Sequence, residues 1–262
     1  MTTLPRSKLS GTLTGHIAGD GADMVLLHGV GLRAEAWLPM LPILAEHARL
    51  HVVDLPGHGE SPLGTHKTLA DFVDTIGEYS ADLTDPYIIG HSMGAMIALE
   101  VTINMQAQII GVAALNAIYR RDEKAKRAVQ TRANDLANSA LPDPQPTLER
   151  WFGDKINSEY QDASRNCRDW LTACDQKGYA AAYHVFAHHD GPADAHLADL
   201  ARPALFITGS EEPNSTPIMS EEMARLAPIG HCHIVDGAAH MGPMTHPDAY
   251  ANVILDHFRR AR

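Results

Sequence analysis

A serine between two glycines is the residue of this chain best placed to act as a nucleophile. Ser92 lies in Gly90-His-Ser-Met-Gly94, which matches the Gly-x-Ser-x-Gly pattern of a nucleophile elbow. A short apolar run precedes the motif and a long one follows it, which predicts a buried strand turning sharply into a buried helix. The turn strains the serine backbone, and Gly90 and Gly94 leave room for it. The alternative is an ordinary glycine turn without chemistry.

The chemistry that suits such a serine is acyl transfer. A serine hydroxyl needs a base, and the base needs a third group that fixes its tautomer. The first turn of the following helix offers free N–H groups to a developing oxyanion, that of Met93 first. The glycine-rich loop at residues 28–33, which directly follows an apolar run, offers a second donor, for which Val30 is the candidate. This chemistry requires no metal and no organic cofactor.

Length and charge restrict the partners. The chain has 262 residues, enough for one α/β domain with an insertion. Its net charge of -11 is spread along the sequence without a basic block, which argues against nucleic acid or an anionic membrane surface as a partner. No apolar run has the length of a signal peptide core or a membrane span. We therefore expect a cytoplasmic monomer or homodimer that acts on a small molecule.

Cysteines and histidines do not indicate a disulfide framework or a metal site. The three cysteines form no C-x-x-C pair and are predicted to be free thiols: Cys167, Cys174 and Cys232. His231 and His233 would share one face of a strand and could be combined with His188 and His189 as metal ligands. No established ligand spacing occurs, so exposed or hydrogen-bonded histidines are the favoured interpretation.

Strand-like and helix-like segments alternate along most of the chain. Apolar runs bounded by turn residues predict strands at residues 12–18 (at a sheet edge), 24–27, 50–53, 87–89, 109–115, 204–208 and 231–235. Helical spacing of apolar residues predicts helices at residues 34–48, 69–83 and 248–258, besides the one after Ser92. This alternation is typical of a largely parallel sheet covered by helices on both faces.

Residues 117–200 interrupt the alternation. A connection of this length is far longer than the usual two to six residues, so the segment is expected to form a domain of its own. Apolar residues at helical spacing predict one helix around residues 160–174 and another around residues 125–136.

The motifs and their order resemble the α/β-hydrolase superfamily, and the resemblance covers nearly the whole chain. The residues that carry it are the His28-Gly29 loop, the turn at residues 54–61, the elbow and the C-terminal motifs. The resemblance implies a mostly parallel eight-stranded sheet, with residues 1–116 and 201–262 as the core and residues 117–200 as a helical cap over Ser92. It also implies a triad of serine, acid and histidine in that chain order.

Within the resemblance, His240 matches the triad base, although Ala239 stands where the family usually has glycine. The family places an aspartate three residues after the glycine that ends the strand at 204–208, and here that position is Glu212. Glu211 remains the alternative acid, one residue away. The family's other acid position holds Asn116, which has no carboxylate. His58 is interpreted as a residue that stabilises its loop.

The substrate is less well defined by the sequence. A carboxylic ester or lactone hydrolase is the first choice, a carbon–carbon bond hydrolase of the ring-cleavage-product type is the enzymatic alternative, and a low-turnover ligand-sensing protein is the non-enzymatic one. The position before Ser92 argues mildly against the carbon–carbon hydrolase, because those relatives often carry Asn there. The expected cavity lining is aromatic residues of the cap and arginines that could bind a substrate carboxylate: Trp151, Trp170, Tyr183, Phe186, Arg33, Arg120 and Arg121.

Overall fold

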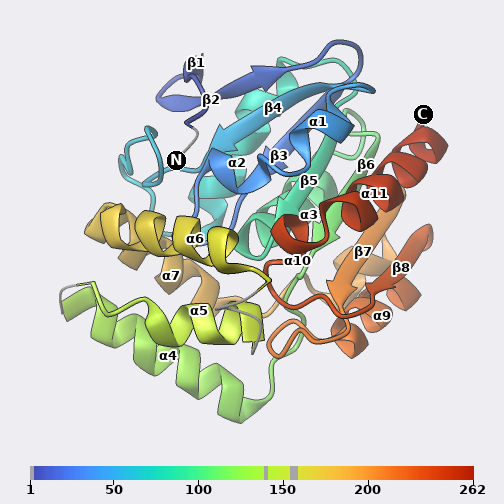
Figure 1. The fold of residues 1–262 in the computed structure, drawn as a ribbon. Coiled ribbons are helices and arrows are strands. Elements are labelled where there is room, and N and C mark those ends of the chain that lie inside the picture. Colours follow the sequence, from blue (N-terminus) through green and yellow to red (C-terminus); the bar gives the residue numbers. More distant parts are fainter. Residues whose placement is uncertain (1–2, 139–140, 154–158) are drawn as a thin grey trace.

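An eight-stranded sheet, in the order β1-β2-β4-β3-β5-β6-β7-β8, forms the centre of the computed structural model, which describes residues 3–138, 141–153 and 159–262 (Figure 1). The strands are β1 (Ser7–Ser10), β2 (Leu13–Ala18), β3 (Asp23–Leu27), β4 (Arg49–Asp54), β5 (Tyr87–His91), β6 (Gly111–Leu115), β7 (Ala204–Gly209) and β8 (Gly230–Val235). The β1–β2 and β2–β4 pairs are antiparallel and the other pairs are parallel. This confirms the expected α/β fold with a mostly parallel sheet.

The central strands are buried on both faces, as their continuous apolar sequences predict. Side chains of a strand alternate between the faces, and β3 illustrates the result. Val25 and Leu27 belong to one apolar cluster, whereas Met24 and Leu26 belong to the other. The sheet therefore separates two cores, each closed by helices.

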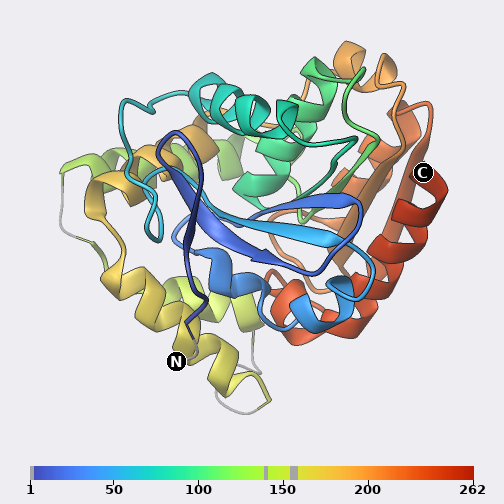
Figure 2. The same ribbon diagram turned by 90° about the horizontal axis from the view of Figure 1, so that it is seen from above.

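Helices cover both faces of the sheet (Figure 2). One face carries α2 (Leu69–Ala81), α3 (Met93–Asn104) and α9 (Pro217–Leu226), and the other carries η1 (Ala34–Trp37), α1 (Leu41–Leu44) and α11 (Pro247–Ala261). The short α10 (Gly242–Thr245) precedes α11. Within the described ranges, no helix combines the length and the apolar character needed to cross a membrane.

Two sequence predictions need correction. Residues 34–48 form one 3-10 turn and one short α-helix rather than a continuous helix, because Pro39 and Pro42 lack the N–H groups that a helix interior requires. The strand at residues 12–18 is not at the sheet edge, since β1 pairs with it from outside. That edge strand is polar and only four residues long, so it gave no apolar signal.

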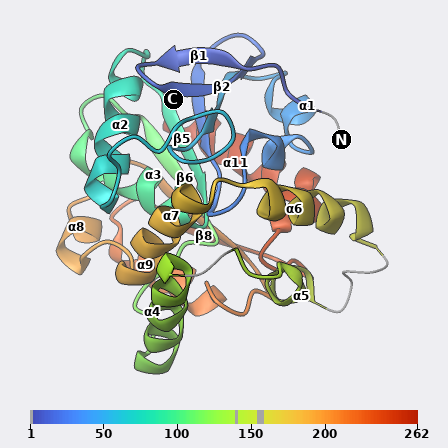
Figure 3. The same ribbon diagram turned by 90° about the vertical axis from the view of Figure 1, so that its left-hand side faces the viewer.

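Between β6 and β7 the chain forms α4 (Glu123–Asn138), α5 (Gln145–Phe152), α6 (Gln161–Ala173), α7 (Gln176–His188) and α8 (Asp194–Ala198). The first four lie together on one side of the sheet, with α4 packed on α7 and α5 on α6 (Figures 1 and 3). The fifth, α8, packs instead against α9. We call α4 to α7 the roof, because they lie across the cavity described next.

Candidate active site

The turn between β5 and α3 holds Ser92 in a strained backbone conformation, with φ of 56° and ψ of -117°. The glycines around it have no space for side chains. A Cβ on Gly90 would lie 2.0 Å from the carbonyl oxygen of Gly94, and a Cβ on Gly94 would lie 2.2 Å from that of Leu27. The sequence therefore folds here into the sharp elbow that the motif predicts, at the carboxyl end of a central strand.

A histidine and a glutamate from two separate loops meet beside this elbow. The Nδ1 atom of His240 lies 2.5 Å from Oε2 of Glu212, and both side chains are buried. Glu212 follows β7 and His240 follows β8, so parallel strands bring the two loops to the same edge of the sheet. Glu211, the alternative acid, is exposed.

The Glu212 carboxylate is held as an anion by several donors. Its Oε2 also accepts a hydrogen bond of 2.7 Å from the side-chain amide of Asn116, and its Oε1 accepts one of 2.8 Å from the backbone N–H of Asn214. Burial alone would raise the pKa of this carboxyl, but the His240 ring and these hydrogen bonds lower it to about 2. Glu212 is therefore charged at neutral pH and suited to orient a histidine.

Two buried histidines fix the loop that carries Val30. The Nε2 atom of His58 accepts a hydrogen bond of 3.0 Å from the N–H of Gly31, and Nε2 of His28 accepts one of 3.0 Å from the N–H of Leu55. Burial lowers the pKa of His58 to about 3 and that of His28 to about 4, so both rings are neutral and can accept. His58 thus stabilises its loop, and through Gly31 also the adjacent Val30 loop.

The N–H groups of Val30 and Met93 have no hydrogen-bond acceptor among the residues that the structure describes. Val30 lies in the loop after β3, and Met93 is the first residue of α3. Free N–H groups at a helix start and in an adjacent loop are suited to hold a negative oxygen.

His91, the residue before the serine, contacts the His240 loop from the other side. Its Nε2 donates a hydrogen bond of 2.8 Å to the carbonyl oxygen of His240, and burial lowers its pKa to about 3. The two rings lie 4.9 Å apart between centroids. A neutral His91 therefore ties the elbow to the loop that carries His240.

A cavity of about 380 Å³ lies between the elbow and the roof. Ser92, His240 and Val30 line it from below, and residues of α4, α5 and α7 line it from above. Of the aromatic residues expected here, Trp151, Tyr183 and Phe186 line this cavity. The Trp151 ring lies next to the His240 ring, tilted by 31° with centroids 5.6 Å apart.

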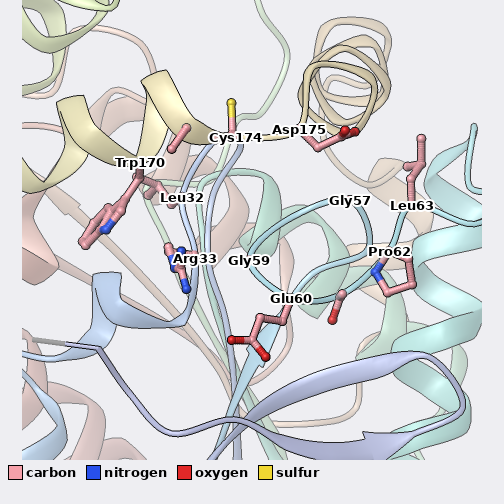
Figure 4. Close-up of a pocket in the computed structure, with 13 residues that line it drawn as sticks. Leu32, Arg33, Gly57, Gly59, Glu60, Pro62, Leu63, Trp170, Cys174 and Asp175 are labelled. Carbon is pink, nitrogen blue, oxygen red and sulfur yellow. The ribbon is translucent and has the colours of Figure 1, made fainter.

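Arg33 and Trp170 do not line the Ser92 cavity. Both line a neighbouring cavity of 390 Å³ between the roof and the turn around Gly57 (Figure 4). The Nε atom of Arg33 pairs with Oε2 of Glu35 at 2.7 Å. The sequence placed Arg33 three residues after Val30, but the loop turns it toward the other cavity.

Arg120 and Arg121 are both engaged within the protein. Arg120 is exposed, does not line the cavity and pairs with Asp194. Arg121 does line it, but its guanidinium donates to Oδ1 of Asp190 at 2.7 Å and to the carbonyl oxygens of His189 and Phe186. Arg120 and Arg121 are therefore not free to bind a substrate carboxylate, contrary to what the sequence suggested.

Three residues that contribute polar groups here were not predicted from the sequence in these roles: Asn116, Arg132 and Arg150. Asn116 stands at the alternative acid position and donates to Glu212 instead. Arg132 lies at helical spacing from Val129 and Leu136, so a charged residue on the apolar face of α4 was the available signal. Arg150 had no comparable signal.

Comparison with known proteins shows the family of this chain. The model of the alpha/beta hydrolase family matches residues 24–253. The chain belongs to the α/β-hydrolase family. It is therefore a hydrolase by family, and the resemblance carried by the sequence motifs is confirmed.

Similar proteins include several hydrolases. One from Acinetobacter baylyi, named (E)-2-((N-methylformamido)methylene)succinate hydrolase, is 36% identical over 247 residues, covering 92% of each chain. A pimeloyl-[acyl-carrier protein] methyl ester esterase from Aeromonas salmonicida is 29% identical, covering 90% of this chain and 95% of that protein. An enol-lactonase structure from Burkholderia xenovorans LB400 shares the fold with a TM-score of 0.85 at 22% identity, covering 97% of this chain and 100% of that one.

Proposed function

We propose that this hydrolase cleaves small carboxylic esters or lactones by transferring the acyl group first to Ser92 and then to water. The observation that carries the proposal is the hydrogen bond between Glu212 and Nδ1 of His240, next to a strained serine in the same cavity. A carboxylate at Nδ1 favours the tautomer whose proton is on that atom, which leaves Nε2 free to act as a base.

In the first half of the reaction His240 removes the Ser92 hydroxyl proton while the oxygen attacks the scissile carbonyl. The N–H groups of Val30 and Met93 stabilise the oxyanion of the tetrahedral intermediate. His240 then gives the proton to the leaving alkoxide, and an acyl-enzyme remains. In the second half, His240 removes a proton from water, which attacks the acyl-enzyme. The tetrahedral intermediate then collapses, His240 returns the proton to the Ser92 oxygen, and the carboxylic acid is released.

The names of the relatives support hydrolysis of acyl compounds. The protein from Aeromonas salmonicida is named as a pimeloyl-[acyl-carrier protein] methyl ester esterase, and the one from Acinetobacter baylyi as a hydrolase of a substituted succinate. The cavity volume is also within the range of sites for small ligands.

The test is turnover of purified protein on 4-nitrophenyl acetate, dihydrocoumarin and a vinylogous diketone. We expect hydrolysis of the ester or the lactone over many equivalents of enzyme, and no turnover above the solution rate by Ser92→Ala. Release of one slow equivalent would instead identify a ligand-sensing protein. Cleavage of the diketone alone would identify a carbon–carbon bond hydrolase.

A further inference from the structure

Two guanidinium groups from different helices meet in the roof of the Ser92 cavity. Nη2 of Arg132, on α4, lies 2.9 Å from Oγ1 of Thr147, and Nη2 of Arg150, on α5, lies 3.5 Å from the same oxygen. Both arginines and the threonine line the cavity that also contains Ser92 and His240. One threonine hydroxyl thus brings two positive charges to one place above the elbow.

Neither guanidinium has a countercharge within the described ranges of the chain. Asp190 pairs with Arg121 and Lys126, and Glu123 pairs with Arg127; no carboxylate among the described residues lies within ion-pair distance of Arg132 or Arg150. The Nε of Arg132 is buried without a hydrogen-bond partner among those residues. A buried N–H of a cation without an acceptor is costly, so an acceptor supplied from the cavity would stabilise the site.

The surroundings hold the Arg132 guanidinium in place without neutralising it. Its central carbon lies 5.4 Å from the centroid of the Tyr183 ring, a cation–π distance. Burial raises the pKa values of Tyr179 and Tyr183, so these phenols stay uncharged at neutral pH. The acidic residue in the lining, Asp122, accepts the backbone N–H of Ala125 at the start of α4.

We propose that Arg132 and Arg150 form a carboxylate-binding subsite, so that the substrate is an acyl compound with a free carboxylate remote from its scissile carbonyl. The planar guanidinium presents paired N–H donors that match the two oxygens of a carboxylate. A substrate held there by its carboxylate directs its other end toward Ser92. The inference rests on the proposed function for the position of the scissile bond, but binding at the arginines does not require Ser92 chemistry.

The probes for this subsite are the dicarboxylates malonate, succinate, glutarate and adipate, each paired with its uncharged diamide. Such diacids are suitable because hydrolysis of a carboxylate-bearing ester leaves a diacid in the cavity. Their binding is measured by calorimetry on wild-type protein and on Ser92→Ala. At least one diacid is expected to bind both proteins roughly tenfold or more tightly than its diamide.

The variants Arg132→Gln and Arg150→Gln are each expected to weaken that diacid by roughly tenfold to a hundredfold and the diamide much less, with Arg132→Lys in between. Arg127→Gln is the matched control, because Arg127 lies on the exposed face of the same helix and pairs with Glu123. This variant should bind the diacid as wild type does. Thermal unfolding of each variant shows whether the roof remains folded.

If no diacid binds better than its diamide, or if folded Arg132→Gln and Arg150→Gln bind diacids as wild type does, the subsite is refuted. Diacid binding without turnover of any ester or lactone would keep the subsite and refute the proposed function. Turnover of neutral esters without diacid binding would keep the proposed function and refute the subsite.

Discussion

The floor of the Ser92 cavity, which is formed by the elbow and by the loops that carry Glu212 and His240, treats charge differently from the roof. The charged Glu212 of the floor is buried, whereas in the roof Arg132 is half-buried and Arg150 is exposed. On the floor, the carboxylate of Glu212 accepts hydrogen bonds from His240, Asn116 and Asn214, so it is stabilised before any ligand enters. In the roof, Arg132 and Arg150 converge on the Thr147 hydroxyl without a countercharge in the described part of the chain. A charge whose hydrogen bonds are all supplied by the protein is held ready for catalysis. A charge that lacks a partner in the protein is suited to bind one from a ligand.

The largest expected effect is a loss of kcat when Glu212, the acid of the floor, is replaced. In Glu212→Gln the amide can donate to Nδ1 of His240 and favour the wrong tautomer, so kcat should fall by around 10⁴-fold. Glu211→Gln is the matched control, since Glu211 is exposed one residue away and should keep nearly normal kcat. Steady-state kinetics on a small ester measures both. Loss of activity in Glu211→Gln alone would show that Glu211, and not Glu212, is the triad acid.

A smaller effect concerns the neutral histidines of the floor and the stability of the fold. Burial lowers the pKa of His58 from 6.5 to about 3, so the unfolded chain binds a proton near pH 6.5 that the folded chain does not bind until about pH 3. Between these values the unfolded state holds more protons, and the free energy of unfolding decreases as the pH falls. One such histidine contributes at most about 1.4 kcal/mol per pH unit.

We therefore expect Tm to decrease from pH 6.5 toward pH 4, and to decrease less steeply in His58→Gln. The Gln side chain can still accept the N–H of Gly31 but does not titrate. His233→Gln, at an exposed position on β8, is the control and should follow the wild-type slope. Identical slopes in wild type and His58→Gln, measured by thermal unfolding, would contradict a neutral buried His58.

The floor could be largely predicted from the sequence because its parts follow strands. Ser92, Glu212 and His240 each come shortly after a predicted strand, and parallel strands bring their carboxyl ends to one edge of the sheet. The hydrogen bond from Asn116 could not be predicted, because its acceptor is almost a hundred residues away and depends on where the two loops turn.

The roof was harder to predict because helical spacing shows which residues share a face but not what that face meets. Trp151 and Trp170 are both aromatic residues of roof helices, yet they line different cavities. Arg121 was expected to bind substrate, but Asp190 and two carbonyl oxygens occupy its guanidinium. Only the packing of α4 on α7 and of α5 on α6 decides which arginines remain available.

Acylation of Ser92 is tested most directly by covalent labelling with a fluorophosphonate followed by peptide mass mapping. Its strained turn and its neighbours in the cavity are the reason to expect reaction there. We expect one adduct per chain, on the peptide that contains Ser92, and none in Ser92→Ala. An adduct on another residue, or undiminished labelling of Ser92→Ala, would contradict it.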